Sequence, residues 1–597
     1  MRKKFLFIVI SVAFAAFAAR ILVCADLYFH DSDVINPVSQ SDMFTYNKLA
    51  KEILNGGHKG VYYYQPFYYA AFLPVIFFCS GSSIWGVIAV QSLLGALTVY
   101  ISALIGARIF GKRAGITAAL LLAFCNVLVI YTPYMLIATL QAFWIVLVFY
   151  LTLNAIKYRK LRWWILLGTV TALSILTRGN VWFFVPGLLF AALYLEFAPK
   201  SFKDAQPKKS ILKKLAPAAL LLIFIFLPQL PFSWHNTKEL GKLTGPSTAA
   251  QVVLALGNTP ETSPGALEYP PAFQAWMNDT KKGISVYSKI WDWFEREPLA
   301  YIELTFRKML LFWDSREIGY NVVLTHHGAK SKLLPILGFI PNSVIISLAI
   351  AGMFMFGSRI LRSRKICLLY YFVAAFWMAT AAFYILSRFR APLVPLLGVF
   401  AGGYLAACFS IIRKKDFGAL LKRCLPFLIF GLFICYIAYD VYSKNYEPIL
   451  MRIARPNGII VDISNKETMV LDNGPRPFGG WVVGKFKPHE VLEKEFAGID
   501  FKAYKTADFE LTTYWEKSGK AEIEINGSKK LIIQNTIGLN TIKLKIPFPK
   551  DGIVKIILLK TDGELYYILD SQRDYGRTLV NGKKVFSELV CRMYCFK

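Results

Sequence analysis

The sequence predicts an α-helical polytopic membrane protein with about eleven transmembrane helices, followed by a soluble β-sandwich-like domain at the C-terminus. Three observations lead to this fold class. Of the 597 residues, 55% are hydrophobic, which is too apolar for a soluble globular chain of this length. Apolar runs long enough to cross a bilayer recur up to residue 441,. From about residue 443, short β-rich runs alternate with turn dipeptides instead,.

Eleven apolar runs have the length of about 17 to 25 residues that a transmembrane helix needs. They lie at 5–24, 84–107, 114–132, 134–156, 161–177, 180–197, 211–232, 333–357, 366–386, 391–412 and 423–441. The run 65–81 is short and contains Pro66 and Pro74, which favours an interfacial or re-entrant helix. Residues 1–24 begin like a signal peptide but offer no evident small-residue cleavage site, so we expect an uncleaved first span.

Charge gives the expected topology. The formal charge of +30 comes mainly from Lys and Arg clusters between apolar runs, a pattern typical of topology signals rather than of nucleic-acid binding. If 65–81 does not cross, every cluster lies on the side of the basic N-terminus, as the positive-inside rule requires. We therefore expect a transmembrane domain at 1–442, whose loops 25–83 and 233–332 face the exterior, and an extracytoplasmic β-rich domain at 443–597.

The C-terminal region carries hairpin signals. They are Asn526-Gly527, Asp551-Gly552, Asp562-Gly563 and Asn581-Gly582, each between short β-rich runs,. A β-sandwich of roughly 130 to 150 residues is therefore expected, either as a stabilising module or as one that binds carbohydrate or acceptor. Among nine scattered cysteines, Cys591 and Cys595 form the one close pair. We expect two thiols there, with a disulfide as the alternative in an oxidising compartment, and neither a metal cluster nor a disulfide framework in the chain.

The predicted spans are almost free of charge inside, which argues against an ion-coupled transporter or a channel. The expected outer side instead collects polar groups from distant segments. They are Asp42, Arg178, His235 with Asn236, and Arg388 with Arg390. Each also has a structural interpretation, because Asp42 can complement the N-terminus of an amphipathic helix, arginines can reach lipid phosphates and His235 can bond to backbone. The residues alone leave both interpretations open.

Five segments in order resemble the GT-C superfamily of membrane glycosyltransferases, in particular the family 39 protein O-mannosyltransferase-like and family 83 aminoarabinose-transferase-like bacterial enzymes. The segments are "SDMFTYNKLA", "YYYQPFYYAAFLP", "LTRGNVWFFVPGLL", "WHNTKELGKLTGPSTAAQVVLALGN" and "SRFRAPLVPLLGVFAGG". The resemblance covers about residues 1–415 and leaves the β-rich domain outside. One feature departs from it: many relatives carry a second acid at the outer end of the fourth span, where this chain has Ala138 and Thr139. Either one acid suffices, or Asp26, Asp31 or Asp33 substitutes, or the activity is altered.

The resemblance implies transfer of a hexosyl or pentosyl group from a polyprenyl-phosphate donor to an acceptor hydroxyl, with inversion, at the outer face of the bacterial cytoplasmic (inner) membrane. It implies Asp42 as catalytic base. The implied phosphate ligands are Arg178, Arg388 and Arg390, and the implied substrate contacts are Tyr46, His235, Asn236 and Asn258.

The expected partners are the lipid-linked sugar, membrane lipid and a lipid, glycan or protein acceptor, with no nucleic acid. We expect no cofactor, since the donor is a substrate and no metal-ligand spacing is evident; dependence on a divalent cation stays open. The alternative is a non-catalytic or flippase-like protein of envelope polysaccharide export, which needs a polar path between the two leaflets.

Overall fold

A computed structural model gives the fold of the chain. It describes residues 2–37, 41–195, 211–260, 262, 264–265, 271–281, 283–438, 462–465, 468–471, 481–496, 505–527, 529–535, 538–547, 549, 551–570, 577–585 and 588–596. The chain divides into two compact units, which are treated separately below. The first comprises Met1–Arg316 with Lys330–Tyr439, and the second comprises Glu317–Ala329 with Asp440–Lys597.

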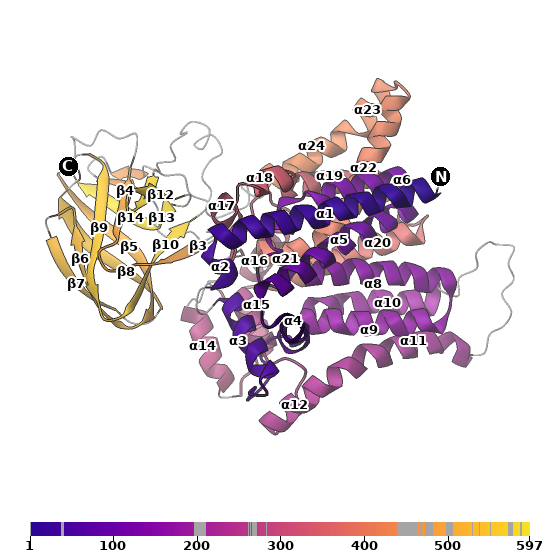
Figure 1. Cartoon of the computed structure of the whole chain (residues 1–597), viewed down its shortest axis with the longest axis horizontal. Coiled ribbons are helices and arrows are strands. Elements are labelled where there is room, and N and C mark those ends of the chain that lie inside the picture. Colours follow the sequence, from indigo (N-terminus) through magenta and orange to yellow (C-terminus); the bar gives the residue numbers. More distant parts are fainter. Residues whose placement is uncertain are drawn as a thin grey trace. The chain divides into compact units, whose positions relative to one another are not determined.

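The first unit is a bundle of helices (Figure 1). Its longer helices are α1 (Arg2–His30), α5 (Ile84–Ile109), α6 (Lys112–Ala123), α8 (Ala138–Tyr158), α9 (Leu161–Thr177), α11 (Ile211–Phe226), α19 (Asn342–Phe356), α20 (Arg364–Ala381) and α22 (Val394–Arg413). The helices of the connecting segments are α2 (Ser32–Ile35), α3 (Asp42–Leu54), α4 (Leu73–Ser80), α12 (Leu230–Leu240), α13 (Ala250–Gly257), α14 (Pro271–Lys281), α15 (Val286–Arg296), α16 (Pro298–Leu311) and α18 (Leu334–Leu337).

Seven helical stretches of the described residues are long and apolar enough to cross a membrane. They are Lys3–His30, Ile84–Ile109, Ala138–Tyr158, Leu215–Leu240, Asn342–Arg359, Ser387–Arg413 and Phe417–Tyr436, and each overlaps one predicted span. The remaining predicted spans coincide with α6 and the short α7 (Asn126–Ile130), α9, Gly179–Tyr194 and α20. The polytopic helical fold is thus confirmed, while the number of eleven crossings stays a prediction.

The predicted span 114–132 is interrupted, and local hydrogen bonds show why. Asn126 N–H donates to Ile340 O at 2.9 Å, and Ile340 N–H donates to Phe124 O at 3.0 Å. The backbone at 124–126 therefore leaves the helical path. At the buried C-terminal end of α6, the Arg20 guanidinium donates to Ala123 O at 3.2 Å. Arg20 is thereby bonded to helix-end carbonyls, which carry partial negative charge.

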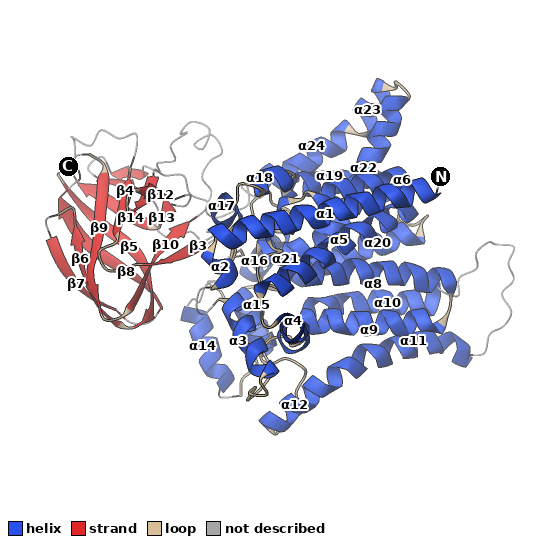
Figure 2. Ribbon diagram, viewed as in Figure 1, coloured by secondary structure: helices blue, strands red, loops and turns tan. Residues whose placement is uncertain are grey.

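The segment 65–81 has a different orientation from its neighbours. It forms a π-helix at Tyr68–Phe72 that continues into α4, and together they are shorter than a bilayer requires,. Figure 2 shows α4 nearly end-on, whereas α1, α8 and α9 lie along the bundle. The helix therefore runs across the direction of the long helices.

Small residues let the long helices approach closely. A Cβ placed on Gly115 of α6 would lie 2.4 Å from Ala103 O of α5, and one on Gly402 of α22 would lie 2.6 Å from Ala114 O of α6. These distances are too short for any side chain. The α5–α6 and α6–α22 contacts therefore depend on glycine, as is common where membrane helices cross.

The second unit contains two antiparallel sheets (Figure 2). Its strands are β1 (Asp462–Asn465), β2 (Thr468–Leu471), β3 (Trp481–Lys485), β4 (Val491–Glu495), β5 (Thr506–Lys517), β6 (Gly519–Ile525), β7 (Lys529–Asn535), β8 (Gly538–Pro547), β9 (Ile553–Thr561), β10 (Glu564–Asp570), β11 (Arg577–Val580), β12 (Lys583–Lys584), β13 (Glu588–Leu589) and β14 (Cys591–Phe596). One sheet has the order β1-β2-β14-β5-β10-β13, with β3 beside β10 and β8 beside β5; the other is β12-β11-β4-β9-β6-β7. The predicted β-sandwich-like architecture is confirmed.

Two of the four turn dipeptides close hairpins. Asn526-Gly527 joins β6 to β7 and Asn581-Gly582 joins β11 to β12, with positive φ at all four residues, as a type I′ turn requires. The prediction was wrong for Asp551-Gly552 and Asp562-Gly563. They precede and follow β9, and β8 and β10 belong to the other sheet. Short turns in a sandwich also connect its layers.

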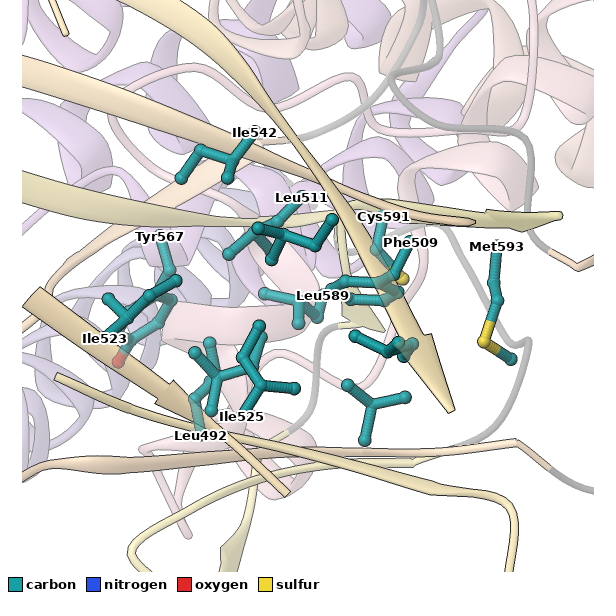
Figure 3. Packing of buried hydrophobic residues seen from close by; sticks show 14 of the residues in the cluster. Leu492, Phe509, Leu511, Ile523, Ile525, Ile542, Tyr567, Leu589, Cys591 and Met593 are labelled. Atoms are coloured by element: carbon teal, nitrogen blue, oxygen red, sulfur yellow. The ribbon is translucent and has the colours of Figure 1, made fainter. Parts of the chain in front are cut away.

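Buried side chains from both sheets form the core of this unit (Figure 3). Phe509 and Leu511 of β5 and Ile523 and Ile525 of β6, from different sheets, belong to one buried cluster. Cys591 and Cys595 are both buried in this cluster. Since they lie four residues apart on one extended strand, their Cα atoms are roughly 13 Å apart, well beyond the reach of a disulfide.

Candidate active site

Asp42 is the first residue of α3, but it does not cap that helix. Ser41 is the N-cap, and its hydroxyl accepts from Phe44 N at 3.1 Å. The Asp42 carboxylate instead forms an ion pair with the Arg388 guanidinium. The two side chains are 19% and 10% exposed, so this pair is largely shielded from water. Asp42 thus lies in the first turn of α3, where a negative charge complements the helix N-terminus as expected, and it also pairs with a cation from a distant segment,.

Arg388 and Arg178 both lie close to one aromatic ring. Arg388 belongs to α21 (Ser387–Arg390), and Arg178 follows α9 in extended conformation. The Arg178 Cζ atom is 3.7 Å from the centre of the Phe389 ring, and the Arg388 Cζ atom is 5.0 Å from it. Stacking of guanidinium on an aromatic face holds both cations in place. Three segments far apart in sequence thus bring Asp42, Arg178 and Arg388 together.

The Arg178 guanidinium has an unusual environment. Burial and the neighbouring Arg388 charge lower the pKa of Arg178 to about 9. Its Nη1 atom is buried and has no hydrogen-bond partner among the described residues. A buried donor without an acceptor costs about 1–3 kcal/mol, and more when charged. Two cations and one carboxylate therefore leave a net positive site with an open donor, which is suited to an anion.

Tyr46 lies one turn beyond Asp42 on α3, within a cluster of tyrosines. Its ring is 5.3 Å from that of Tyr68 and 5.8 Å from that of Tyr64. Burial, followed by the Asp42 charge, raises the pKa of Tyr46 well above its usual value. Tyr46 therefore stays protonated and supplies a hydroxyl and an aromatic face beside the carboxylate.

Polar contacts continue from this cluster to the other outer carboxylates. Tyr68 donates to Gln91, and Gln91 donates to Tyr134 O at 2.9 Å. The Tyr134 hydroxyl in turn donates to Asp31 at 2.6 Å, and Lys330 pairs with Asp31 at 2.9 Å. Asp31 thus belongs to a structural network that includes a cation of its own.

Asp26 and Asp33, the other candidates for a second acid, are also bonded within the fold. Asp26 accepts from the Ser331 hydroxyl at 2.7 Å and from Leu333 N at 3.0 Å. Asp33 lies in the first turn of α2, and its N–H donates to Asp31. The positions of the missing acid, Ala138 and Thr139, form the first turn of α8. Asp42, in contrast, forms an ion pair with Arg388.

Arg390 differs from Arg388 although the two share one helical turn. Its guanidinium donates to the carbonyls of Phe312 at 3.2 Å and Asp314 at 2.6 Å, and also to that of Arg316. It is 2% exposed. Arg390 thus holds the chain that follows α16, and the geometry gives its predicted role as a phosphate ligand no support.

His235 and Asn236 lie on α12 near the tyrosine-rich segment. The His235 ring is 4.9 Å from the Tyr62 ring and 6.1 Å from the His58 ring, and Nε2 lies 2.8 Å from Gly60 O. Asn236 is fully buried; it accepts from Tyr62 N at 2.7 Å and donates to Gly245 O at 3.0 Å. Asn236 therefore anchors two loops, while His235 remains partly exposed beside the tyrosines.

Asn258 is likewise engaged in the fold, through a residue that the sequence did not single out. Its Oδ1 accepts from the buried Lys308 ammonium at 2.9 Å, and its Nδ2 donates to Ala382 O at 2.8 Å. Burial lowers the pKa of Lys308 to about 7. This chain of contacts supports the turn that precedes Arg388. The sequence does not distinguish Lys308 from the other lysines, because residue spacing alone does not show which lysine is buried.

Part of the chain is similar in sequence to a known protein family. Residues 64–232, less than a third of the chain, match the sequence model of the family described as dolichyl-phosphate-mannose-protein mannosyltransferase. No curated protein sequence matches the chain.

Several solved structures are similar in part. The oligosaccharyltransferase of Archaeoglobus fulgidus is 16% identical with a TM-score of 0.40, over 75% of this chain and 57% of that one. ArnT from Cupriavidus metallidurans, bound to undecaprenyl phosphate, is 14% identical with a TM-score of 0.35, over 66% and 63%. Arabinosyltransferase EmbB from Mycobacterium smegmatis is 12% identical with a TM-score of 0.27, over 97% and 64%.

The chain thus spans less than two thirds of the length of each of these three enzymes. Over residues 64–232, the family match confirms the resemblance to membrane glycosyltransferases that the sequence predicted.

Proposed function

We propose that this protein transfers a sugar from a polyprenyl-phosphate donor to an acceptor hydroxyl at the outer face of a bacterial cytoplasmic membrane. The observation that carries this proposal is the contact of Asp42 with Arg388, 346 residues away, beside the stacked Arg178. Together with the glycosyltransferase family match, this contact provides a base and two cations in one partly buried site.

The cations suit the leaving group. When the bond between the anomeric carbon and the phosphate oxygen breaks, the phosphate gains negative charge. Arg178 and Arg388 are fixed by stacking on Phe389 before the reaction, so little reorganisation is needed as that charge develops. Guanidinium groups also match phosphate oxygens bidentately. In this proposal both arginines hold the donor phosphate.

The carboxylate suits the acceptor. Asp42 accepts the proton of the acceptor hydroxyl as its oxygen attacks the anomeric carbon, a role that typically contributes about 100- to 10,000-fold in rate. Direct attack opposite the phosphate inverts the anomeric configuration. Tyr46 lies beside Asp42 on α3, and His235 is connected to Tyr46 through the rings of Tyr62 and Tyr69. Both are the proposed contacts of sugar or acceptor.

Charge distribution supports the proposed orientation. In Figure 1 the α5–α6 and α8–α9 connections lie at the bundle end that holds the N-terminus, whereas α3 and α12 lie at the opposite end. Both connections are basic, as in "ARIFGKR" and "KYRKLR". The positive-inside rule assigns that end to the cytoplasm, which leaves Asp42 on the exoplasmic side.

The decisive experiment incubates purified protein with radiolabelled polyprenyl-phosphate hexoses and pentoses and a membrane extract as acceptor source. We expect transfer of at least one sugar, and loss of that transfer in Asp42→Asn, because the amide cannot accept the proton. Glu52→Gln changes an acid on the same helix and serves as the matched control with normal transfer. Normal transfer by a well-folded Asp42→Asn variant contradicts the proposed catalytic base.

A second prediction concerns the donor. Arg178→Ala removes the guanidinium with the open Nη1 donor, so the KM for the lipid-linked sugar should rise and kcat should fall, with little change in acceptor KM. Arg296→Ala, which alters an exposed arginine of α15, should behave as wild type. Steady-state kinetics with each substrate varied in turn provide the measurement, and unchanged donor parameters in Arg178→Ala remove it from the phosphate site.

A further inference from the structure

The ion pair between Asp42 and Arg388 has a consequence for the order of events. In the structure, Asp42, the proposed base, is paired with Arg388, a proposed ligand of the donor phosphate. The carboxylate oxygen that accepts from Arg388 has less lone-pair capacity left for an acceptor hydroxyl,. The pair must therefore open before either group performs the role given above.

Opening the pair without a replacement is unfavourable. Both side chains are largely buried, with exposures of 10% and 19%, and separating a buried pair leaves uncompensated charge. An exchange of anions avoids this cost, because Arg388 keeps a negative partner throughout. A phosphate group is the natural replacement, since its oxygens can accept from two guanidinium groups at once.

Arg178 favours the incoming phosphate over the carboxylate. Its side chain stacks on the same Phe389 ring as Arg388, and its Nη1 lacks an acceptor among the described residues. A phosphate that bridges both arginines satisfies that donor and relieves the repulsion between the two cations. Asp42, once released, remains at the N-terminal turn of α3, where the helix dipole stabilises a negative charge.

We infer that Asp42 is an internal anion that the donor phosphate displaces, so that donor binding creates the catalytic base and precedes activation of the acceptor. This inference rests on the proposed function and adds the order of binding to it. The site is held closed to acceptor chemistry until the lipid phosphate has arrived.

The reverse exchange, in which Asp42 replaces the phosphate on Arg388, releases the polyprenyl phosphate after transfer. During transfer, the acceptor oxygen forms its bond to the anomeric carbon, and the carbon–oxygen bond to phosphate breaks with its electron pair on the phosphate oxygen. The acceptor proton passes to Asp42. After Asp42 loses this proton to water, its carboxylate again competes for Arg388 and displaces the polyprenyl phosphate.

Binding measurements on the full-length protein in detergent test the inference. The probe is undecaprenyl phosphate, with undecaprenol as the control lipid without charge. Asp42→Asn removes the competing anion and should bind the lipid phosphate about 5-fold or more tightly than wild type, the lower end of typical coupling between two sites. Glu52→Gln should leave the affinity unchanged. Equal or weaker binding by Asp42→Asn overturns the inference.

A second measurement uses the unmodified protein and so does not depend on folding of a variant. Carbodiimide labelling of Asp42, quantified by mass spectrometry, should increase when undecaprenyl phosphate is added and stay constant with undecaprenol. Labelling that does not respond to the phosphate overturns the displacement.

Failure of the proposed function gives a different result. If neither Arg178→Gln nor Arg388→Gln weakens binding of undecaprenyl phosphate, the arginines are not the phosphate site at all. If these variants weaken binding while Asp42→Asn does not strengthen it, the site stands and only the exchange is wrong.

Discussion

Lys308 shows how burial changes a residue whose sequence context looks ordinary. Its ammonium is fully buried and bonded to Asn258, and burial lowers its pKa from 10.5 to about 7. Between pH 7 and about 10 the unfolded chain therefore binds one more proton than the folded chain at this residue. Stability should rise with pH in that window, by up to about 1.4 kcal/mol per unit, and the slope should disappear below pH 7.

Thermal unfolding of the wild type and of Lys308→Met between pH 6 and 9.5 measures this contribution. The difference between the two proteins isolates Lys308 from other titrating groups, and the wild type should gain stability relative to the variant as pH rises above 7. A constant difference across the range contradicts a lysine with a lowered pKa.

The sequence singled out Asp42, Arg178 and Arg388 as charged residues near the ends of predicted spans or in the outer loops, and the structure brings the three together. The sequence could not separate Arg388 from Arg390, because two residues in one helical turn point in different directions only once the neighbouring helix is placed. Nor could it assign Asn236 and Asn258, whose amides bond to backbone and to Lys308. Those partners lie in distant segments that no spacing reveals.

At the scale of elements, the close crossing of α22 and α6 depends on Gly402. A methyl group on Gly402 would meet Ala114 O at 2.6 Å, whereas one on Gly357 would meet nothing within 4 Å. Gly402→Ala should therefore destabilise the protein by about 1–3 kcal/mol through overpacking, while Gly357→Ala should change stability little. Thermal unfolding in detergent compares the two, and equal melting temperatures would contradict the packing described.

The sequence located helices and strands correctly where the signal for an element lies within that element. Apolar length located the long helices, and Asn-Gly dipeptides located two hairpins. The break at 124–126 was missed because the hydrogen bonds to Ile340 that stabilise it are tertiary. The Asp-Gly turns beside β9 were misassigned since a tight turn does not specify which sheet the next strand joins.

For the whole molecule, all residues of the proposed site belong to the first unit. A chain truncated after residue 438 should therefore bind undecaprenyl phosphate with an affinity within about twofold of that of the full chain, because no group assigned to the phosphate is lost. Binding in detergent is the measurement, with undecaprenol as control. Loss of binding by a monodisperse truncated protein shows that the second unit contributes to the site.

The central claim is that residues 42 and 388 meet in the membrane-embedded protein. Cysteines introduced at both positions, in a chain whose native cysteines are replaced, can be joined in isolated membranes by a short bifunctional thiol reagent. We predict an efficient cross-link in the double variant that is absent in each single variant. Thiols that are both reactive, yet never joined at any reagent length, would contradict the site from which the function is inferred.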